Sequence, residues 1–211
     1  MTGDREGVCA VVLAAGKGQR MRAGGIATPK HAIEVRTQAG VAPMLVHVLR
    51  ALARSRATRT VVVLAPEDAI GEELARGAGA AICHADPPDE GRAASIRSGV
   101  RAAPEAAGWL FALADQPFLE PSDFDRLISA LGDASPPRAA GARRIVHATY
   151  AGQRGSPVLF GSGHRAALLA LSGAQGGRAV LAAHPECAVP VPLDPARGLD
   201  LDTPADLPES G

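Results

Sequence analysis

The sequence predicts an α/β domain in which helices cover both faces of a mostly parallel sheet. Strand-like and helix-like segments alternate along the 211 residues, the pattern typical of such a sheet. Residues 8–13 and 109–114 are continuous apolar runs, as expected for strands buried on both faces. A glycine-rich basic loop directly follows the first run. We therefore expect three layers, helix, sheet and helix, with a ligand crevice at the carboxyl ends of the strands.

The first half of the chain contains four of the expected strands. Apolar residues recur at helical spacing over residues 44–52, and Pro117 prevents the fourth strand from continuing its ladder. The loop over residues 86–92 is polar and contains proline. The expected strands are 8–13, 60–64, 80–83 and 109–114, and the expected helices are 44–52, 67–76 and 93–103.

The second half is expected to combine helices with a small β-rich flap. Residues 132–141, rich in Ala, Pro and Gly, predict a mobile loop. Two strands flank a glycine turn at 152–155, and we expect residues 132–160 to form a flap on the acceptor side of the sheet. The expected strands are 144–150 and 157–160, and the expected helices are 121–131, 163–171 and 177–183. One domain is expected over residues 1–211, with tails at 1–7 and 208–211.

Composition argues against a nucleic-acid-binding protein, a membrane protein and a domain held together by disulfides or zinc. The chain carries 22 basic and 22 acidic side chains, so no general attraction to nucleic acid or a membrane is expected. Cys9, Cys83 and Cys187 have no CxxC spacing, which argues against a zinc or disulfide framework and fits a reducing compartment; we interpret them as small core residues. The sequence has no signal-peptide pattern and no apolar run of the ~20 residues that span a bilayer, so the cytoplasm is expected.

The glycine-rich loop is suited to binding phosphate. Glycine allows positive φ and close approach to a ligand, so the amides of residues 14–18 (Ala14, Ala15, Gly16, Lys17 and Gly18) could point at phosphate oxygens. The loop has no Gly-Lys-Ser/Thr frame, and Met21 stands where a dinucleotide fingerprint needs a third glycine. An ordinary βα turn is the structural alternative.

Five blocks in order resemble one family. Residues 13–21, LAAGKGQRM, followed by Pro29 and Lys30, resemble the opening signature of nucleotidyltransferases that transfer a nucleoside monophosphate to a phosphorylated acceptor. The chain is similar to the MobA-like nucleotidyltransferases, and most similar to the molybdenum cofactor cytidylyltransferases, which join CTP to the phosphate of molybdopterin and release pyrophosphate. The other four blocks are 91–100, 113–117, 154–160 and 200–207.

The resemblance implies a nucleotide-diphospho-sugar transferase-like fold and a set of residue roles. Arg20 and Lys30 are implied to bind the triphosphate and its developing charge, with Lys17 as a looser helper. Asp115 and Asp202 are implied to hold Mg²⁺, with Asp200 as the second choice. Arg92 and Ser95 belong to the base-recognition block. The implied partners are CTP or another NTP, the acceptor molybdopterin, and a molybdoenzyme or chaperone that receives the cofactor.

Each role has a structural alternative. Arg20 could pair with a surface carboxylate and Lys17 could be solvated. Asp115 could cap a turn, and Asp202 or Ser95 could cap a helix. The six histidines have no ligand spacing, and we interpret them as structural or surface residues unless His31, beside the catalytic lysine, is an exception.

Three departures from the family pattern bear on the activity. The loop over residues 22–28 is longer than usual, Ser156 replaces His or Asn, and Ala174 replaces an acidic residue in a block expected on the acceptor side. Relatives that use CTP resemble Leu-Ala-Ala-Gly rather than Leu-Ala-Gly-Gly, so Ala15 favours CTP. The alternatives are GTP or another phosphorylated acceptor, an oxidoreductase, or a nucleotide-binding regulatory protein.

Overall fold

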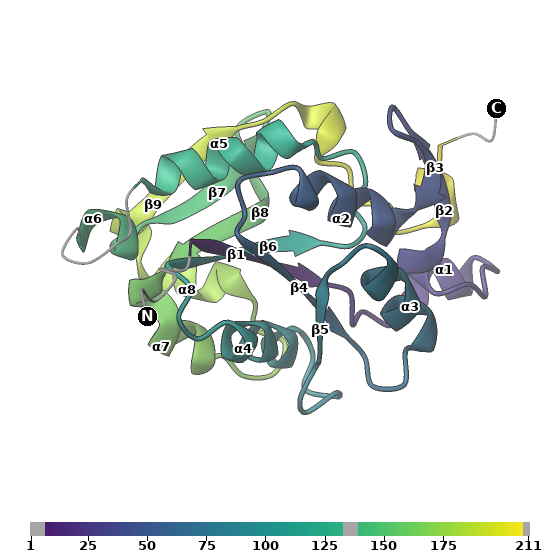
Figure 1. Ribbon diagram of the computed structural model, residues 1–211, viewed down its shortest axis with the longest axis horizontal. Coiled ribbons are helices and arrows are strands. Elements are labelled where there is room, and N and C mark those ends of the chain that lie inside the picture. The colour runs from purple at the N-terminus through teal and green to yellow at the C-terminus, as the bar shows by residue number, and fades with distance from the viewer. Residues whose placement is uncertain (1–6, 133–138, 209–211) are drawn as a thin grey trace.

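The structure is a computed structural model that describes residues 7–132 and 139–208 (Figure 1). Its centre is a seven-stranded sheet in the order β5-β4-β1-β6-β8-β7-β9. The strands β5, β4, β1 and β6 are parallel, β8 is antiparallel to β6 and β7, and β9 is parallel to β7. The bounds are β1 Val8–Leu13, β4 Arg59–Leu64, β5 Ala81–His84, β6 Gly108–Leu113, β7 Ile145–Tyr150, β8 Gln153–Gly161 and β9 Ala188–Pro192. The expected mostly parallel sheet is confirmed.

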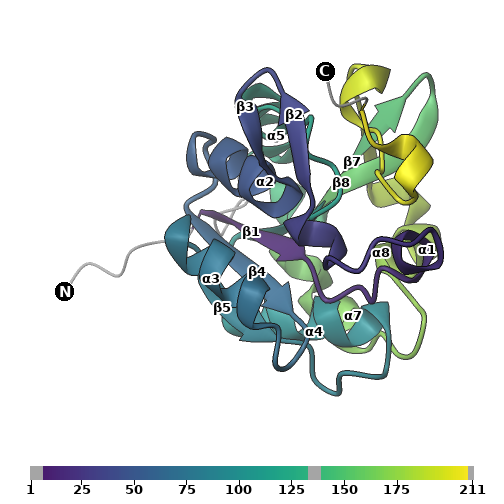
Figure 2. The same ribbon diagram turned by 90° about the vertical axis from the view of Figure 1, so that its right-hand side faces the viewer.

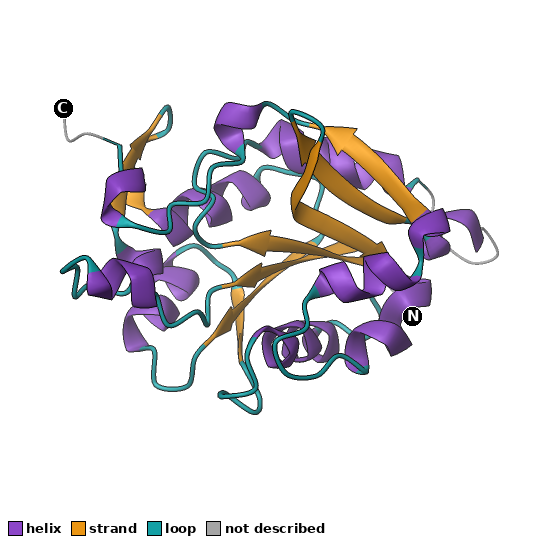
Figure 3. Cartoon of the chain, turned by 180° about the vertical axis from the view of Figure 1, so that it is seen from behind, coloured by secondary structure: helices purple, strands orange, loops and turns teal. Residues whose placement is uncertain are grey.

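Helices cover both faces of this sheet (Figures 1 and 3). Side chains of strand β1 alternate between two cores. On one face, Ala10 and Val12 pack with Leu45 and Phe124. On the other face, Cys9 and Val11 pack with residues of α4 and its neighbours. One layer contains α2 Met44–Ala53, α3 Ala69–Gly77 and α5 Pro121–Leu131; the other contains α4 Arg92–Ala102, α7 Arg165–Leu169 and α8 Gly177–Ala183. The three-layer expectation is therefore confirmed.

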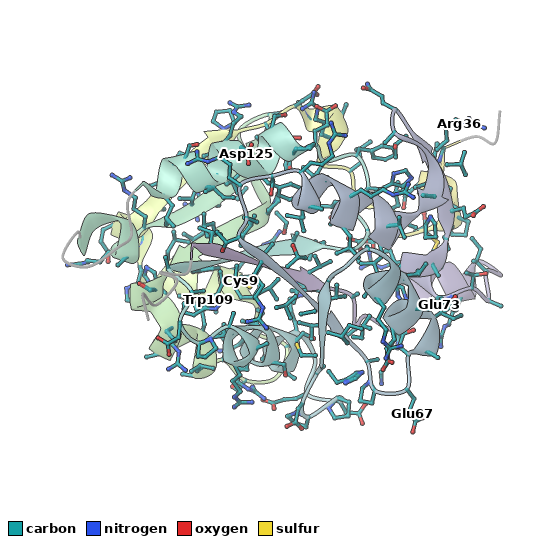
Figure 4. All side chains as sticks on the ribbon, in the orientation of Figure 1. Cys9, Arg36, Glu67, Glu73, Trp109 and Asp125 are labelled. Atoms are coloured by element: carbon teal, nitrogen blue, oxygen red, sulfur yellow. The ribbon has the colours of Figure 1, made fainter. Side chains whose placement is uncertain are left out.

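The cysteines differ in burial. Cys9 is 1% exposed and lies inside the molecule with Trp109 (Figure 4). Cys83 and Cys187 are only partly buried at the margin of the same core. The interpretation as core residues therefore holds fully for Cys9 alone. No helix in the described part of the chain is long and apolar enough to cross a membrane.

The predicted flap is wrong in its location. The strands β7 and β8 extend the main sheet, with Phe160 of β8 paired to Trp109 of β6. Their side chains are buried on both faces, since Ile145 joins one core and Val146 the other. The small separate sheet is instead an antiparallel hairpin of β2 Glu34–Thr37 and β3 Gly40–Pro43.

Other differences are local. The expected mobile loop at 132–141 mostly lies outside the described residues, and its end begins helix α6 Ala139–Arg143. The helix expected at 163–171 is the shorter α7, preceded by a 3₁₀ turn at Ser162–His164. Strand β9 is an additional element that was not predicted from the sequence, and its two prolines are tolerated because it is an edge strand. The tails at 1–7 and 208–211 mostly lie outside the described residues, but the Gly7 carbonyl accepts a hydrogen bond from Ala107.

A third small core gathers distant segments at the carboxyl end of the sheet. Met21 of α1 Gln19–Ala23 is fully buried, and it packs with Val35 of the hairpin, Met44 and Leu201. Figure 2 shows α1, the hairpin and the yellow C-terminal segment on the side that faces the viewer. This packing brings residues near both ends of the chain to the end of β6.

Candidate functional site

A cavity of about 690 Å³ opens at the carboxyl ends of β1 and β6. The loop after β1 and the start of α1 contribute residues 15–20, and the loop after β5 with the start of α4 contributes the opposite wall. The end of β6, the 3₁₀ turn Lys30–Ala32 and the C-terminal segment complete the lining with Asp115, Lys30 and Asp202. The loops after β1, β5 and β6 therefore converge on one cavity, as the strand order predicts.

The glycine-rich loop leaves its amides available to a ligand. Gly18 has φ 58° and ψ 33°, in the left-handed region that glycine reaches without penalty. Within the described chain, no group accepts a hydrogen bond from the N–H groups of residues 15–18. Ala14 differs from this expectation, because its N–H donates to the Val63 carbonyl at 2.9 Å and continues the sheet. Its amide is therefore committed to the fold and cannot reach a phosphate.

Two cations and two carboxylates meet at one edge of the cavity. The Lys30 Nζ contacts Asp115 Oδ2 and lies 2.5 Å from Asp202 Oδ1. Arg20 Nη1 lies 2.7 Å from Asp202 Oδ2. The Lys30 side chain is only 14% exposed. Burial opposes its charge, but hydrogen bonds and charges from Asp115 and Asp202 outweigh burial and raise the pKa of Lys30. The lysine is therefore an ammonium at neutral pH.

The C-terminal segment reaches this edge through backbone pairing and burial. The Leu201 N–H donates to the Asp115 carbonyl at 3.1 Å, and the Leu201 side chain is buried in the third core. Asp202 follows directly and faces Lys30. The helix cap next to it is Thr203, whose hydroxyl bonds Asp206. Capping therefore does not account for the Asp202 carboxylate.

Asp115 leaves one oxygen without a partner. Its Oδ1 is buried and has no hydrogen-bond partner among the described residues. Asp200 lies near both carboxylates. Burial raises the pKa of Asp200, and the negative charges of Asp115 and Asp202 raise this pKa further. Within residues 7–132 and 139–208, no group of three or more His, Cys, Asp or Glu side chains forms a metal-binding cluster.

The wall opposite the glycine-rich loop contains the expected base-recognition residues. Arg92 and Ser95 line the same cavity as Ala15 of the glycine-rich loop. Ser95 is 7% exposed and lies inside α4, whose N-cap is Gly91, so Ser95 does not cap the helix. Lys17 forms an exposed ion pair with Asp89 at 3.1 Å. Such a pair contributes little to stability.

Sequence reasoning missed part of this wall. Asp89 lines the cavity, and no local motif marks it. Ala174, expected on the acceptor side, lines this cavity beside Gly91. Ser156 does not line it; its carbonyl accepts a hydrogen bond from the Tyr150 hydroxyl at 2.7 Å.

A basic glycine-rich loop after one strand and a carboxylate at the end of the adjacent strand line one cavity, at the edge where open α/β sheets bind their ligands. Residues 10–188 match the MobA-like NTP transferase domain, and the chain belongs to this family. The expectation of a nucleotidyltransferase domain is thereby confirmed. The match does not single out the molybdenum cofactor cytidylyltransferases within the family.

Curated relatives match this chain over part of its length. The 2-C-methyl-D-erythritol 4-phosphate cytidylyltransferase of Citrobacter koseri is 37% identical over 123 residues, which are 58% of this chain and 50% of that protein. The chain thus spans about half the length of the curated relatives it matches.

Solved structures of lower identity share the fold. A nucleotidyl transferase from Methanothermobacter superposes with a TM-score of 0.75 at 20% identity, over 94% of this chain and 93% of the other. The protein Rv0371c of Mycobacterium tuberculosis superposes with a TM-score of 0.73 at 23% identity, over 96% of both chains. Its manganese complex has a TM-score of 0.68 at 22% identity, over 94% and 95%. The expected nucleotide-diphospho-sugar transferase-like fold is confirmed.

Proposed function

We propose that this protein transfers CMP from CTP to the phosphate group of a small acceptor and releases pyrophosphate. The observation that carries the proposal is the meeting of Arg20, Lys30, Asp115 and Asp202 beside unpaired loop amides at one cavity. Cations and amides bind the triphosphate, and the cavity has the volume of a small-molecule site. The cytoplasm is the proposed compartment.

The chain's own residues account for the charge changes in this reaction. An oxygen of the acceptor phosphate attacks the α-phosphorus of CTP, and the bond between that phosphorus and the bridging oxygen of pyrophosphate breaks. The acceptor is already an anion, so no strong general base is needed. Lys30 and Arg20 stabilise the negative charge that develops on the phosphates, and the loop amides orient them.

Mg²⁺ fits the residues at this edge, and we propose that Asp115 and Asp202 hold it. The buried Asp115 Oδ1 has no hydrogen-bond partner among the described residues, and Mg²⁺ is commonly bound by one or two carboxylates together with substrate phosphates and water. The manganese complex of a relative supports a divalent cation in this fold. Held by Asp115 and Asp202, the cation would neutralise negative charge that develops on the phosphates.

Ala15 and Ser95 are proposed to favour cytosine. Both line the cavity, and a methyl group at position 15 narrows the space beside the base. A purine that displaces this wall leaves buried polar groups unpaired, at about 1–3 kcal/mol each. This corresponds to roughly tenfold to a hundredfold in affinity.

The acceptor is proposed to be a phosphate monoester. Molybdopterin is implied by the sequence blocks, and the curated relatives favour a sugar-alcohol phosphate such as 2-C-methyl-D-erythritol 4-phosphate. A molybdoenzyme or chaperone is a partner only if molybdopterin is the acceptor. No observation on the site favours the oxidoreductase or regulatory alternatives.

The test is pyrophosphate release from each NTP with MgCl₂ and each of the two acceptors. We expect kcat/KM for CTP to exceed that for GTP by roughly tenfold or more, and Ala15→Gly to narrow the ratio. Ala14→Gly is the matched control, because the Ala14 side chain is buried in the core and does not line the cavity of about 690 Å³. Equal values for CTP and GTP would refute the cytidylyl assignment, and no release from any NTP would refute nucleotidyl transfer to these acceptors.

A further inference from the structure

A buried arginine that has no part in the proposed chemistry connects two segments of the wall opposite the glycine-rich loop: the loop after β5 and the segment after α7. Arg97 lies in the middle of α4 and is 8% exposed. Its guanidinium donates to both Glu90 oxygens, with Nη1 to Oε1 at 2.9 Å and Nη2 to Oε2 at 2.5 Å. Nη1 also donates to the Leu171 carbonyl at 2.6 Å. One side chain therefore holds the loop after β5 and the segment after α7 at the same time.

The two segments also bond each other directly. The Gly173 N–H donates to Glu90 Oε1 at 3.2 Å, and the Ala93 N–H donates to the Gly173 carbonyl at 3.3 Å. Gly91 has φ 76° and ψ −149°, a conformation that is essentially restricted to glycine. A Cβ at Gly91 would lie 3.3 Å from the Gly173 oxygen. The segments are therefore closely packed as well as bonded.

The bonded residues flank the residues that line the cavity. Asp89 and Gly91 stand on either side of Glu90, and Ala174 follows Gly173. A shift of Glu90 or Gly173 therefore moves the lining of the cavity. The hydrogen bonds from Arg97 and from the Gly173 N–H lower the pKa of Glu90, so the pair is ionised at neutral pH.

Stability alone is a weak reason for this pair, in which the Arg97 side chain is 9% exposed and the Glu90 side chain 29% exposed. Removing an arginine and a carboxylate from water carries a desolvation cost, and apolar residues of similar volume often serve the fold as well. A bidentate pair does supply fixed geometry, because the planar guanidinium fits a carboxylate in one orientation.

We infer that Arg97 is a positioning residue for nucleotide binding: with Glu90 it holds the loop after β5 against the segment at 171–174, so that this wall of the cavity is formed before the nucleotide enters. The inference rests on the proposed function, because it takes the cavity to be the nucleotide site. Arg97 acts through Glu90 and the backbone and does not itself line the cavity.

The inference predicts that variants of Arg97 bind CTP more weakly and discriminate less between CTP and GTP. If Arg97→Gln reduces the population with a formed wall to about a tenth, the apparent Kd for CTP rises about tenfold. The ratio of the Kd values for GTP and CTP should fall, because a loose wall discriminates less between bases. Arg97→Lys keeps the positive charge but cannot form the bidentate pair with Glu90, so its Kd for CTP should lie between those of the unmodified protein and Arg97→Gln.

The experiment measures the Kd of CTP and of GTP by calorimetry with MgCl₂, together with the melting temperature of each variant. The variants are Arg97→Gln, Arg97→Lys and Glu90→Gln. Arg76→Gln is the matched control, because Arg76 forms an Arg–Glu pair with Glu72 on the exposed surface of α3. If Arg97→Gln does not fold, Glu90→Gln decides, since it retains a side chain of the same shape.

Support requires that Arg97→Gln and Glu90→Gln weaken CTP binding and narrow the selectivity while Arg76→Gln changes neither. If the unmodified protein binds CTP and these two variants bind it equally well, the positioning role is refuted and the proposed function stands. A lower melting temperature with unchanged Kd values also refutes it. If the unmodified protein binds neither nucleotide, both proposals fail.

Discussion

Replacement of Lys30 by methionine tests the charge balance at the edge of the cavity. In the structure the Lys30 ammonium contacts Asp115 and Asp202 at once. Asp202 keeps Arg20 as a partner when the ammonium is removed, at 2.7 Å. Asp115 is left without an ion-pair partner among the described residues, and its Oδ1 is already unpartnered. The variant therefore isolates one carboxylate in a partly buried position.

The expected loss of stability follows from this isolation. An unpartnered buried polar group costs about 1–3 kcal/mol. The Asp115 side chain is 22% exposed and faces a cavity, which favours the lower half of that range, about 1–2 kcal/mol. For a chain of this length, that corresponds to a melting temperature lower by roughly 2–8 °C.

A divalent cation should reverse the loss in the variant. In the variant, Mg²⁺ would be held by Asp115 and Asp202, the two carboxylates that Lys30 Nζ contacts in the unmodified protein. If it binds the variant with a Kd of about 1 mM, then about 10 mM Mg²⁺ restores about 1.4 kcal/mol. The unmodified protein without nucleotide should respond less, because its own ammonium already neutralises the pair.

The assay is thermal unfolding with and without MgCl₂, and Lys17→Met is the matched control. Lys17 and Asp89 are 68% and 85% exposed, so their pair contributes about 0–1 kcal/mol. Equal responses to Mg²⁺ in the unmodified protein and Lys30→Met would refute the reasoning. So would a Lys30→Met variant that is no less stable than Lys17→Met.

Three further predictions concern the site, the packing and pH. Asp115→Asn should lower kcat/KM roughly a hundredfold with the fold intact, and near-normal rates at limiting Mg²⁺ would contradict the metal role. Gly99→Ala should cost about 1–3 kcal/mol in urea unfolding, because its Cβ would lie 2.3 Å from Val11 Cγ1, whereas Gly77→Ala meets open space and should not destabilise; equal effects would contradict this packing. Burial lowers the pKa of His31 below its ordinary value of 6.5, although the charge of Asp68 opposes this. The unfolded chain therefore takes up a proton that the folded protein does not, and stability falls as pH drops from about 7 to about 5. The urea midpoint of unfolding, measured at both pH values, should fall less in His31→Gln than in the unmodified protein. An equal fall in both proteins would show that His31 does not contribute to the pH dependence.

The sequence by itself determined the elements whose signals are local. The strand Val8–Leu13 and the helix Gly177–Ala183 were predicted with their observed bounds, since apolar runs and helical spacing decide such segments. The helix Pro121–Leu131 was also predicted with both ends, because Pro121 suits a first helical position and Gly132 a helix end. Local signals further predicted that the loops after the parallel strands share one crevice.

Tertiary structure alone decided where β7 and β8 lie. Their apolar patterns fit a flap or the edge of a large sheet equally well, and pairing with β6 selects the sheet. The hairpin of β2 and β3 has no comparable signal, because β2 buries only Val35 and β3 only Ala42.

The charge cluster and the buried arginine were likewise settled by contacts between distant residues. Lys30 and Asp202 are 172 positions apart, and the burial of Leu201 against Met21 brings them together. Arg97 reaches a carbonyl 74 positions away through the packing of α4 beside α7. Local propensity carries no information about such pairs, because their free energy arises only when the layers of the fold bury and align both partners.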